Sequence, residues 1–187
     1  MMNTSDTRRR VVMIAMMCTL ATGALAQDTP LIAMFPSAVV SRLWDAEGDL
    51  RATHTRSGDE LTITVKRASG RPVESGWAGV CVQNATPVSL QNFTHATAVV
   101  ESSARVVMDI KLEKTKFQDG TILLTNHGTV GAGSRTLEWK LRAADEVGSG
   151  TLAQARRMCF YVLAEGFPSR QDEVTVKIRG VKFDIHP

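Results

Sequence analysis

Aromatic residues are few in this chain of 187 residues, which contains one Tyr, three Trp and six Phe. Recognisable catalytic motifs are missing as well. Neither the G-x-S-x-G pattern of serine hydrolases nor the H-E-x-x-H pattern of zinc peptidases occurs. The four histidines, His54, His95, His127 and His186, are scattered singly, without the spacing of a metal site. These absences favour a non-catalytic protein.

An excess of charge of one sign is also missing. The chain has 22 basic and 19 acidic residues, and three of the basic and one of the acidic lie in the first 26 positions, so the rest has a net charge near +1. Nucleic-acid-binding proteins normally show a clustered basic face, and none is evident here. No stretch after residue 26 approaches the roughly 18 consecutive apolar residues of a membrane span. We therefore expect neither a nucleic-acid partner nor a membrane span.

The first 26 residues have the pattern of a secretory signal peptide. A positive segment, Arg8 to Arg10, precedes the apolar run Val11 to Leu20, and Ala24-Leu25-Ala26 provides a small-x-small cleavage signal before Gln27. The alternative is a buried N-terminal helix. A signal peptide predicts cleavage between Ala26 and Gln27 and a bacterial protein that is exported, either periplasmic or secreted.

Cysteine is scarce, and its position matters. Cys18 leaves with the signal peptide, so Cys81 and Cys159 remain as an even pair in an oxidising compartment. A disulfide between them would stabilise the fold by about 4 kcal/mol in the chain-entropy model. The alternative is two buried thiols on separate strands.

Beyond residue 50 apolar and polar residues alternate in segment after segment, which is typical of strands with one buried face. The clearest segments are 61–66, 106–113, 137–142 and 174–179, and further strands are expected at 50–55, 76–83, 94–100, 120–126 and 157–164. Gly- and Asp-containing turns separate them. The pattern predicts an all-β protein, an antiparallel β-sandwich or jelly roll of about nine to ten strands. We expect this sandwich to form one domain over 45–187, preceded by an extended leading segment over 27–44.

The order of these segments is more specific than their number. The stretches "GDELTITVKRASGRPVESGWAGVCVQ", "VSLQNFTHATAVVE", "RVVMDIKLE", "RTLEWKL", "MCFYVLAEG" and "DEVTVKIRGVKFDI" follow one another. This series resembles the galactose-binding-like jelly roll of bacterial carbohydrate-binding modules and is similar to the related domain of the complex I intermediate-associated family. The resemblance covers roughly residues 45–187 and implies a carbohydrate or envelope glycan as ligand.

The resemblance also implies a structural calcium ion near the first and last strands. Asp45, Glu47 and Asp184 lie at suitable ends and could supply oxygen ligands. Because no D-x-D-x-D pattern accompanies them, ordinary surface carboxylates remain the alternative. No other cofactor is expected.

The alternation of side-chain direction along a strand shows which residues share a face in the two expected strands that contain cysteine. Trp77, Cys81 and Gln83 share one face of their strand, and Tyr161 shares a face with Cys159. A Cys81–Cys159 bond would therefore put Trp77 and Tyr161 on the same face of one sheet, where they could form a platform for sugar rings. The alternative is that the leading segment covers this face and both rings are packed.

Other residues divide into core and surface positions. Trp139 shares its face with Leu137 and Leu141, which indicates core packing. Asp109 points outward from its strand together with Lys111 and Glu113. Asn126 or His127 could join Asp109 from a loop after 120–125, although charged residues on a strand more often form a solvated face.

These observations lead to one functional hypothesis and one alternative. The hypothesis is an exported, non-catalytic protein that binds a polysaccharide or envelope glycan. Its rings Trp77 and Tyr161 would stack on sugars, and Gln83, Asp109 and Asn126 would form hydrogen bonds to them. The alternative is a protein-interaction or structural envelope domain whose outer sheet docks a protein partner, which the small number of aromatic residues favours.

Overall fold

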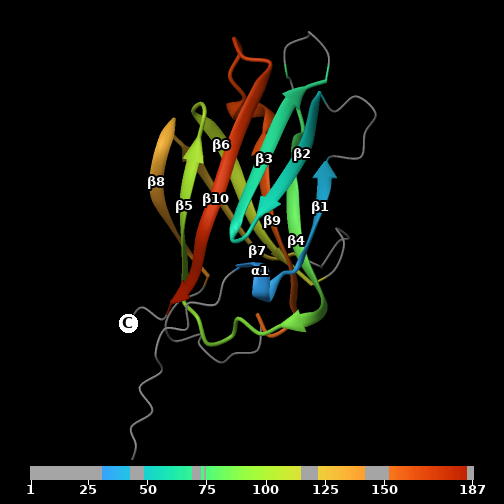
Figure 1. The fold of residues 1–187 in the computed structure, drawn as a ribbon, viewed down its shortest axis with the longest axis vertical. Helices are drawn as coiled ribbons and strands as arrows, with labels where there is room; N and C mark the ends of the chain where they lie inside the picture. The colour runs from blue at the N-terminus through green and yellow to red at the C-terminus, as the bar shows by residue number, and fades with distance from the viewer. Residues whose placement is uncertain are drawn as a thin grey trace, which may run out of the picture.

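The computed structural model describes residues 31–42, 49–68, 73, 75–114, 122–141 and 152–184. Within these residues the chain forms two five-stranded sheets in which all neighbouring strands are antiparallel. The two sheets pack face to face, with the second in front in Figure 1. The predicted all-β sandwich of the jelly-roll type is confirmed.

The first sheet has the strand order β1-β4-β9-β6-β7. Its strands are β1 (Ser37–Arg42), β4 (Trp77–Val88), β9 (Ala155–Leu163), β6 (Val106–Glu113) and β7 (Ile122–Val130). The second sheet has the order β2-β3-β10-β5-β8. Its strands are β2 (Leu50–Ser57), β3 (Glu60–Arg67), β10 (Glu173–Asp184), β5 (His95–Ser102) and β8 (Gly133–Lys140).

The core lies between the sheets and is built from the alternating apolar residues of both. Leu61, Ile63 and Val65 of β3 face it from the second sheet, and Val80 and Val82 of β4 face it from the first. Every one of these five side chains is at most 1% exposed. Burial of this kind contributes about 25 cal/mol per Å² of apolar surface removed from water, which makes the alternation the main determinant of the fold.

Trp139 of β8 lies in this core, as its alternation with Leu137 and Leu141 predicted. Its side chain is 6% exposed. β8 itself runs from Gly133 to Lys140 and so begins earlier than the predicted strand at 137–142. The strand predicted at 120–126 is β7, which continues to Val130. Asn126 therefore lies within a strand and not in the loop after it.

The leading segment contains two elements of the sandwich. The short helix α1 (Leu31–Met34) precedes β1, which pairs with β4 along Ser37–Arg42. Leu31 and Phe35 are buried in the core between the sheets. The backbone carbonyl of Phe35 also accepts a hydrogen bond from Arg56 Nη1 at 2.7 Å. The described part of this segment thus caps one end of the core and extends the first sheet at its edge.

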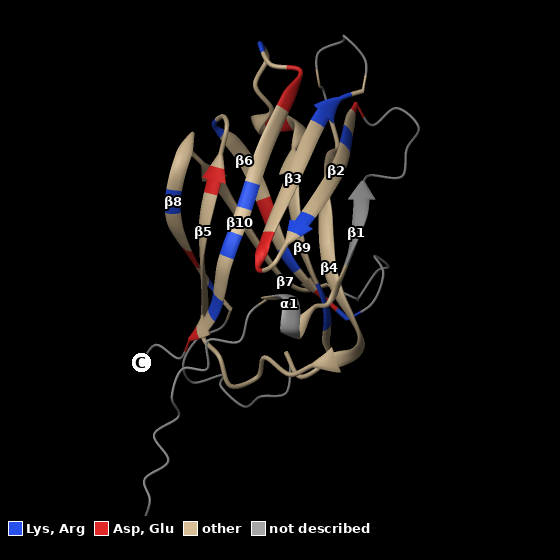
Figure 2. Cartoon of the chain, in the orientation of Figure 1, with Lys and Arg blue, Asp and Glu red and all other residues tan. Residues whose placement is uncertain are grey.

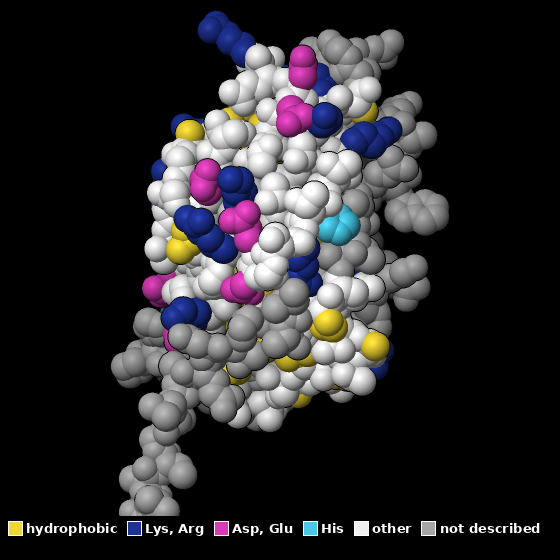
Figure 3. Space-filling view, viewed as in Figure 1, with side chains coloured by type: hydrophobic (Ala, Val, Ile, Leu, Met, Phe, Trp, Pro, Cys, Tyr) yellow, Lys and Arg dark blue, Asp and Glu magenta, His cyan; other side chains and the backbone are white. Residues whose placement is uncertain are grey.

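The outer face of the second sheet carries interspersed charges of both signs (Figures 2 and 3). Cross-strand ion pairs connect them: Lys66 with Glu173 at 2.7 Å, and Lys177 with Glu101 at 3.8 Å. Exposed pairs of this type contribute little to stability, about 0–1 kcal/mol each. Among the described residues no helix is both long and apolar enough to cross a membrane.

Candidate functional site

The outer face of the first sheet carries most of the residues to which the sequence pointed. The strand pairing aligns them in rows, because directly opposed residues of antiparallel strands point to the same face. One row consists of Gly79, Tyr161, Asp109 and His127. The next consists of Cys81, Cys159, Lys111 and Thr125, and a third of Gln83, Arg157 and Glu113.

The disulfide at the centre of this face is formed. Cys81 and Cys159 are directly opposed on β4 and β9, and their sulfur atoms are bonded at 2.04 Å. Both side chains are 0% exposed. With Tyr161 they form a small buried cluster that is separate from the core between the sheets. The sequence predicted this bond, and the alternative of two free thiols does not hold in the structure.

The disulfide brings the two aromatic side chains together as the sequence analysis anticipated. The ring centroids of Trp77 and Tyr161 are 4.3 Å apart, with an angle of 50° between the ring planes. The two rings differ in exposure: Tyr161 is 1% exposed, whereas Trp77 is half-buried and packs onto the cluster from its edge. Tyr161 therefore supports the Trp77 ring, and of the two only Trp77 has an accessible surface.

Gly79 is required for the close approach of β4 to β9 beside this ring pair. A Cβ atom at residue 79 would collide with the backbone carbonyl of Phe160 and would lie 2.8 Å from Cα of Tyr161. Both atoms belong to the backbone of β9, so neither can move aside without disturbing the sheet. The absence of a side chain here sets the spacing of the strands beneath the rings.

A chain of polar contacts runs along the same face next to the rings. Asp109 on β6 lies 3.3 Å from Lys111 Nζ and 2.9 Å from Nδ1 of His127, which is opposite it on β7. Nε2 of His127 in turn lies 3.4 Å from Glu165. Glu165 belongs to the 3-10 helix η2 (Ala164–Gly166), which follows β9 directly. The side chain of Asp109 is 13% exposed, whereas those of His127 and Glu165 are more than half exposed. This series of contacts therefore runs from the sheet toward solvent.

These polar groups and the Trp77 ring border one cavity of about 520 Å³. A volume of this size lies within the range of ligand sites, roughly 300–1,000 Å³. Its lining residues are Ser75, Gly76, Trp77, Asp109, His127, Leu163, Ala164 and Glu165. The cavity therefore combines an aromatic ring with two carboxylates and an imidazole.

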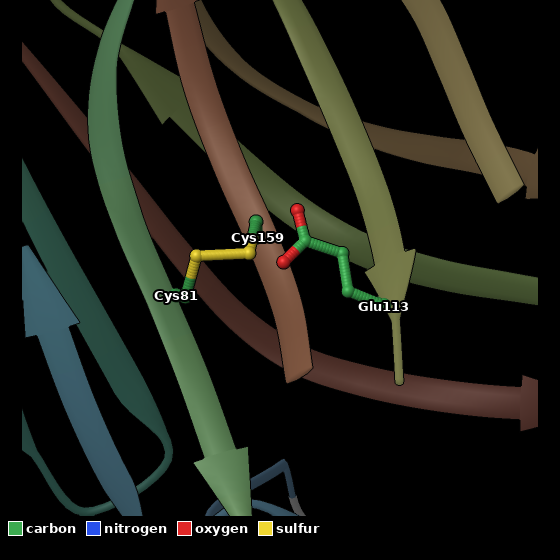
Figure 4. A group of neighbouring side chains, drawn as sticks. All are labelled: Cys81, Glu113 and Cys159. Carbon is green, nitrogen blue, oxygen red and sulfur yellow. A yellow bond between two sulfur atoms is a disulfide. The ribbon is translucent and has the colours of Figure 1, made fainter. Parts of the chain in front are cut away.

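Glu113 adds a buried charge to this face. Its carboxylate is 0% exposed, forms an ion pair with Arg157 at 3.1 Å, and lies 3.5 Å from the hydroxyl of Tyr161. Burial raises the pKa of the Glu113 carboxyl above its ordinary value, and the charges of Arg157 and Lys111 act in the opposite direction. In Figure 4 this carboxylate points toward the Cys81–Cys159 bond.

The residues predicted for sugar binding are only partly brought together. Trp77 and Asp109 border the same cavity. Gln83 shares their face but lies six residues beyond Trp77 on β4, a distance of about 20 Å along a strand. Asn126 is opposite Ile110 and points to the other face of the sheet. His127, and not Asn126, lies next to Asp109, because β7 continues through both residues and its alternation turns Asn126 inward.

Asn126 borders a different cavity, of about 300 Å³, at the edge between the two sheets. Met108, Leu137 and Trp139 also line that cavity. Glu165 was not predicted as a site residue. Its contribution depends on the turn of η2 after β9, for which the local sequence gives no functional signal.

The predicted calcium ligands are not brought together within the described residues. Asp45 and Glu47 lie outside them. Asp184 ends β10, where its backbone carbonyl accepts a hydrogen bond from the backbone N–H of Thr94 at 3.0 Å. The calcium site therefore stays a prediction.

Comparison with known proteins adds evidence on the fold. No family model matches the sequence, and no curated protein matches it either. Among solved structures, that of PfGH50B is similar with a TM-score of 0.50 at 12% identity, over 81% of this chain and 23% of the other. A CBM4 structure has a TM-score of 0.46 at 10% identity, over 84% of this chain and 100% of the other.

A third similar structure is the family 11 carbohydrate-binding module from Clostridium thermocellum in complex with a β-1,3-1,4-mixed-linked tetrasaccharide. Its TM-score is 0.44 at 12% identity, over 78% of this chain and 95% of the other. This chain spans about a quarter of the length of the agarase-type structures that it matches. At 12% identity the likeness to the PfGH50B structure concerns the fold alone.

Proposed function

We propose that this protein is an exported, non-catalytic carbohydrate-binding domain that holds a glycan in the cavity beside Trp77. The observation that carries the proposal is the convergence of the Trp77 ring, Asp109, His127 and Glu165 around one open cavity. A sugar ring presents both an apolar C–H face and a rim of hydroxyl groups. A site for sugar therefore needs an aromatic surface and hydrogen-bonding groups at its border.

Each residue has a defined part in this proposal. The exposed surface of Trp77 packs against the C–H face of a sugar ring, and Tyr161 holds Trp77 in place from below. The carboxylates of Asp109 and Glu165 accept hydrogen bonds from sugar hydroxyls. His127 lies 2.9 Å from Asp109 and 3.4 Å from Glu165, and it fixes the orientation of both carboxylates.

Gln83 and Asn126 have no place in this cavity. Gln83 could contact only a longer glycan that extends along β4. Affinity for a short oligosaccharide should be weak, because a few contacts barely exceed the cost of ordering the ligand. The signal-peptide pattern and the buried disulfide both support export.

Affinity electrophoresis through gels that contain soluble polysaccharides, with and without calcium, tests this proposal. We expect retardation by at least one glycan. Trp77→Ala should abolish it and Glu165→Gln should weaken it, while both variants keep the far-ultraviolet circular dichroism of the parent protein. Glu101→Gln, on the outer face of the second sheet, is the matched control for Glu165→Gln and should leave retardation unchanged.

Failure across a broad panel of glycans would contradict the proposal and favour a protein partner at this face. Retardation that persists in folded Trp77→Ala would place the glycan elsewhere on the molecule. Dependence of retardation on calcium would support the predicted site at Asp184.

A further inference from the structure

Three side chains that can bind metal ions converge on the outer face of the first sheet, beside the cavity proposed for the glycan. Each of Cys81, Cys159 and Glu113 offers one ligand atom, and these atoms all lie within 4.8 Å of one another. They come from three adjacent strands, β4, β9 and β6. Figure 4 shows the Glu113 carboxylate directed at the two sulfur atoms. Among the described residues this is the one group of three that the geometry brings within reach of a single ion.

The donor set has the chemistry of a zinc site. Thiolate sulfur and carboxylate oxygen are both ligands of Zn²⁺. With Zn–S bonds of about 2.3 Å, tetrahedral geometry places neighbouring sulfur ligands roughly 3.7 Å apart. Two cysteines directly opposed on antiparallel strands can reach that separation once they are not bonded to each other. In the disulfide, neither sulfur is a thiolate, so neither can bind the ion in this way.

The surroundings suit a bound cation. Two thiolates and a carboxylate carry three negative charges, which Arg157 and Lys111 partly offset. The Tyr161 hydroxyl lies 3.2 Å from Cys81 Sγ and 3.5 Å from Glu113 Oε1. Hydrogen bonds from neighbouring groups of this kind orient metal ligands. All three ligand residues are 0% exposed.

We propose that Cys81, Cys159 and Glu113 form a three-ligand site for a divalent cation of the zinc type when the disulfide is reduced. The disulfide and the cation are then alternative means of joining β4 to β9. A trialkylphosphine and water convert the disulfide to two thiols, and the phosphine is oxidised to its oxide. Binding of the cation then displaces one proton from each thiol. The fourth position is filled by water.

Cobalt substitution tests the proposal on the protein without residues 1–26, so that Cys81 and Cys159 are its only cysteines. The protein is unfolded in urea with a trialkylphosphine, because the buried sulfurs are otherwise shielded from the reductant, and refolded without oxygen before titration with Co²⁺. We expect a thiolate-to-cobalt charge-transfer band that saturates at one equivalent and disappears when Zn²⁺ is added. The disulfide-bonded protein should show no band.

Three variants separate this site from nonspecific thiol binding. Cys81→Ser and Cys159→Ser should each abolish the band. Glu113→Gln removes one of the three ligands and should weaken Co²⁺ binding by at least the roughly ten-fold that loss of a partner outside the ligand set costs. Glu101→Gln, which changes a surface carboxylate of the other sheet, should bind as the parent protein does.

Circular dichroism provides a second readout if the reduced chain is unstable. Recovery of the strand spectrum, or a higher Tm, on addition of Zn²⁺ to the reduced chain would support the site. Absence of a one-equivalent band in the reduced parent chain would overturn the proposal. So would Co²⁺ binding that is unaffected by Glu113→Gln, since it would show that the thiols bind without the third ligand.

Discussion

Removal of the disulfide should cost this protein a large part of its stability. Cys81 and Cys159 are 78 residues apart in sequence. The chain-entropy model assigns a loop of that length about 4.5 kcal/mol at 25 °C, because the bond restricts the unfolded chain. Domains are typically stable by about 5–15 kcal/mol, so the double variant Cys81→Ala/Cys159→Ala should remain folded by a narrow margin. Alanine is preferred to serine because both positions are fully buried.

Urea unfolding, followed by far-ultraviolet circular dichroism, measures this loss. The parent protein unfolded in the presence of reductant provides the internal control, since it lacks the bond but keeps both side chains. We expect the double variant and the reduced parent to be destabilised by similar amounts, each about 4 kcal/mol. A loss below about 1 kcal/mol in both would refute the reasoning, because the bond would then restrict the unfolded chain far less than its loop length requires.

Substitutions at Gly79 and at Trp139, each with a control, test the packing of the sandwich. Gly79→Ala should destabilise the protein by about 1–3 kcal/mol or more, because its Cβ would meet the backbone of Phe160. In thermal melts Gly128→Ala, where the added atom meets nothing within 4 Å, should match the parent. Trp139→Ala should cost about 3–5 kcal/mol. Trp139→Phe should cost less than about 1.5 kcal/mol, because the buried Nε1 has no hydrogen-bond partner to lose. Chemical denaturation distinguishes these values, and an equal loss in the two Trp139 variants would contradict the assigned packing.

The alternation of residues predicted the described strands other than β1, which lies in the segment expected to lead into the domain, and it predicted the faces that pack between the sheets. It also placed Cys81 and Cys159 on the same side as Trp77 and Tyr161, and the register Cys81–Cys159 with Gly79–Tyr161 confirms this arrangement. The alternation of period two determines which residues share a face of one strand. The expected disulfide then related the faces of the two strands that carry Cys81 and Cys159.

The order of neighbouring strands could not be read from the sequence, and the details of the site depend on it. Glu113 and Tyr161 have the alternation of outward residues, yet both are buried, Tyr161 in the cluster with the disulfide and Glu113 in its ion pair with Arg157. Asn126 was expected in a loop beside Asp109, but β7 continues to Val130 and the alternation of that strand turns Asn126 to the other face. Glu165 reaches the cavity through a turn, which has no periodic signal.

The indole signals of the three tryptophans test the central claim most directly. In a ¹H–¹⁵N correlation spectrum Trp44, Trp77 and Trp139 each contribute one indole N–H peak, which single Trp→Phe variants assign. On titration with a glycan that retards the protein, we predict a progressive shift of the Trp77 peak, while the buried Trp139 peak stays in place. A Trp77 peak that remains fixed while backbone peaks elsewhere move would contradict the assignment of this cavity as the glycan site.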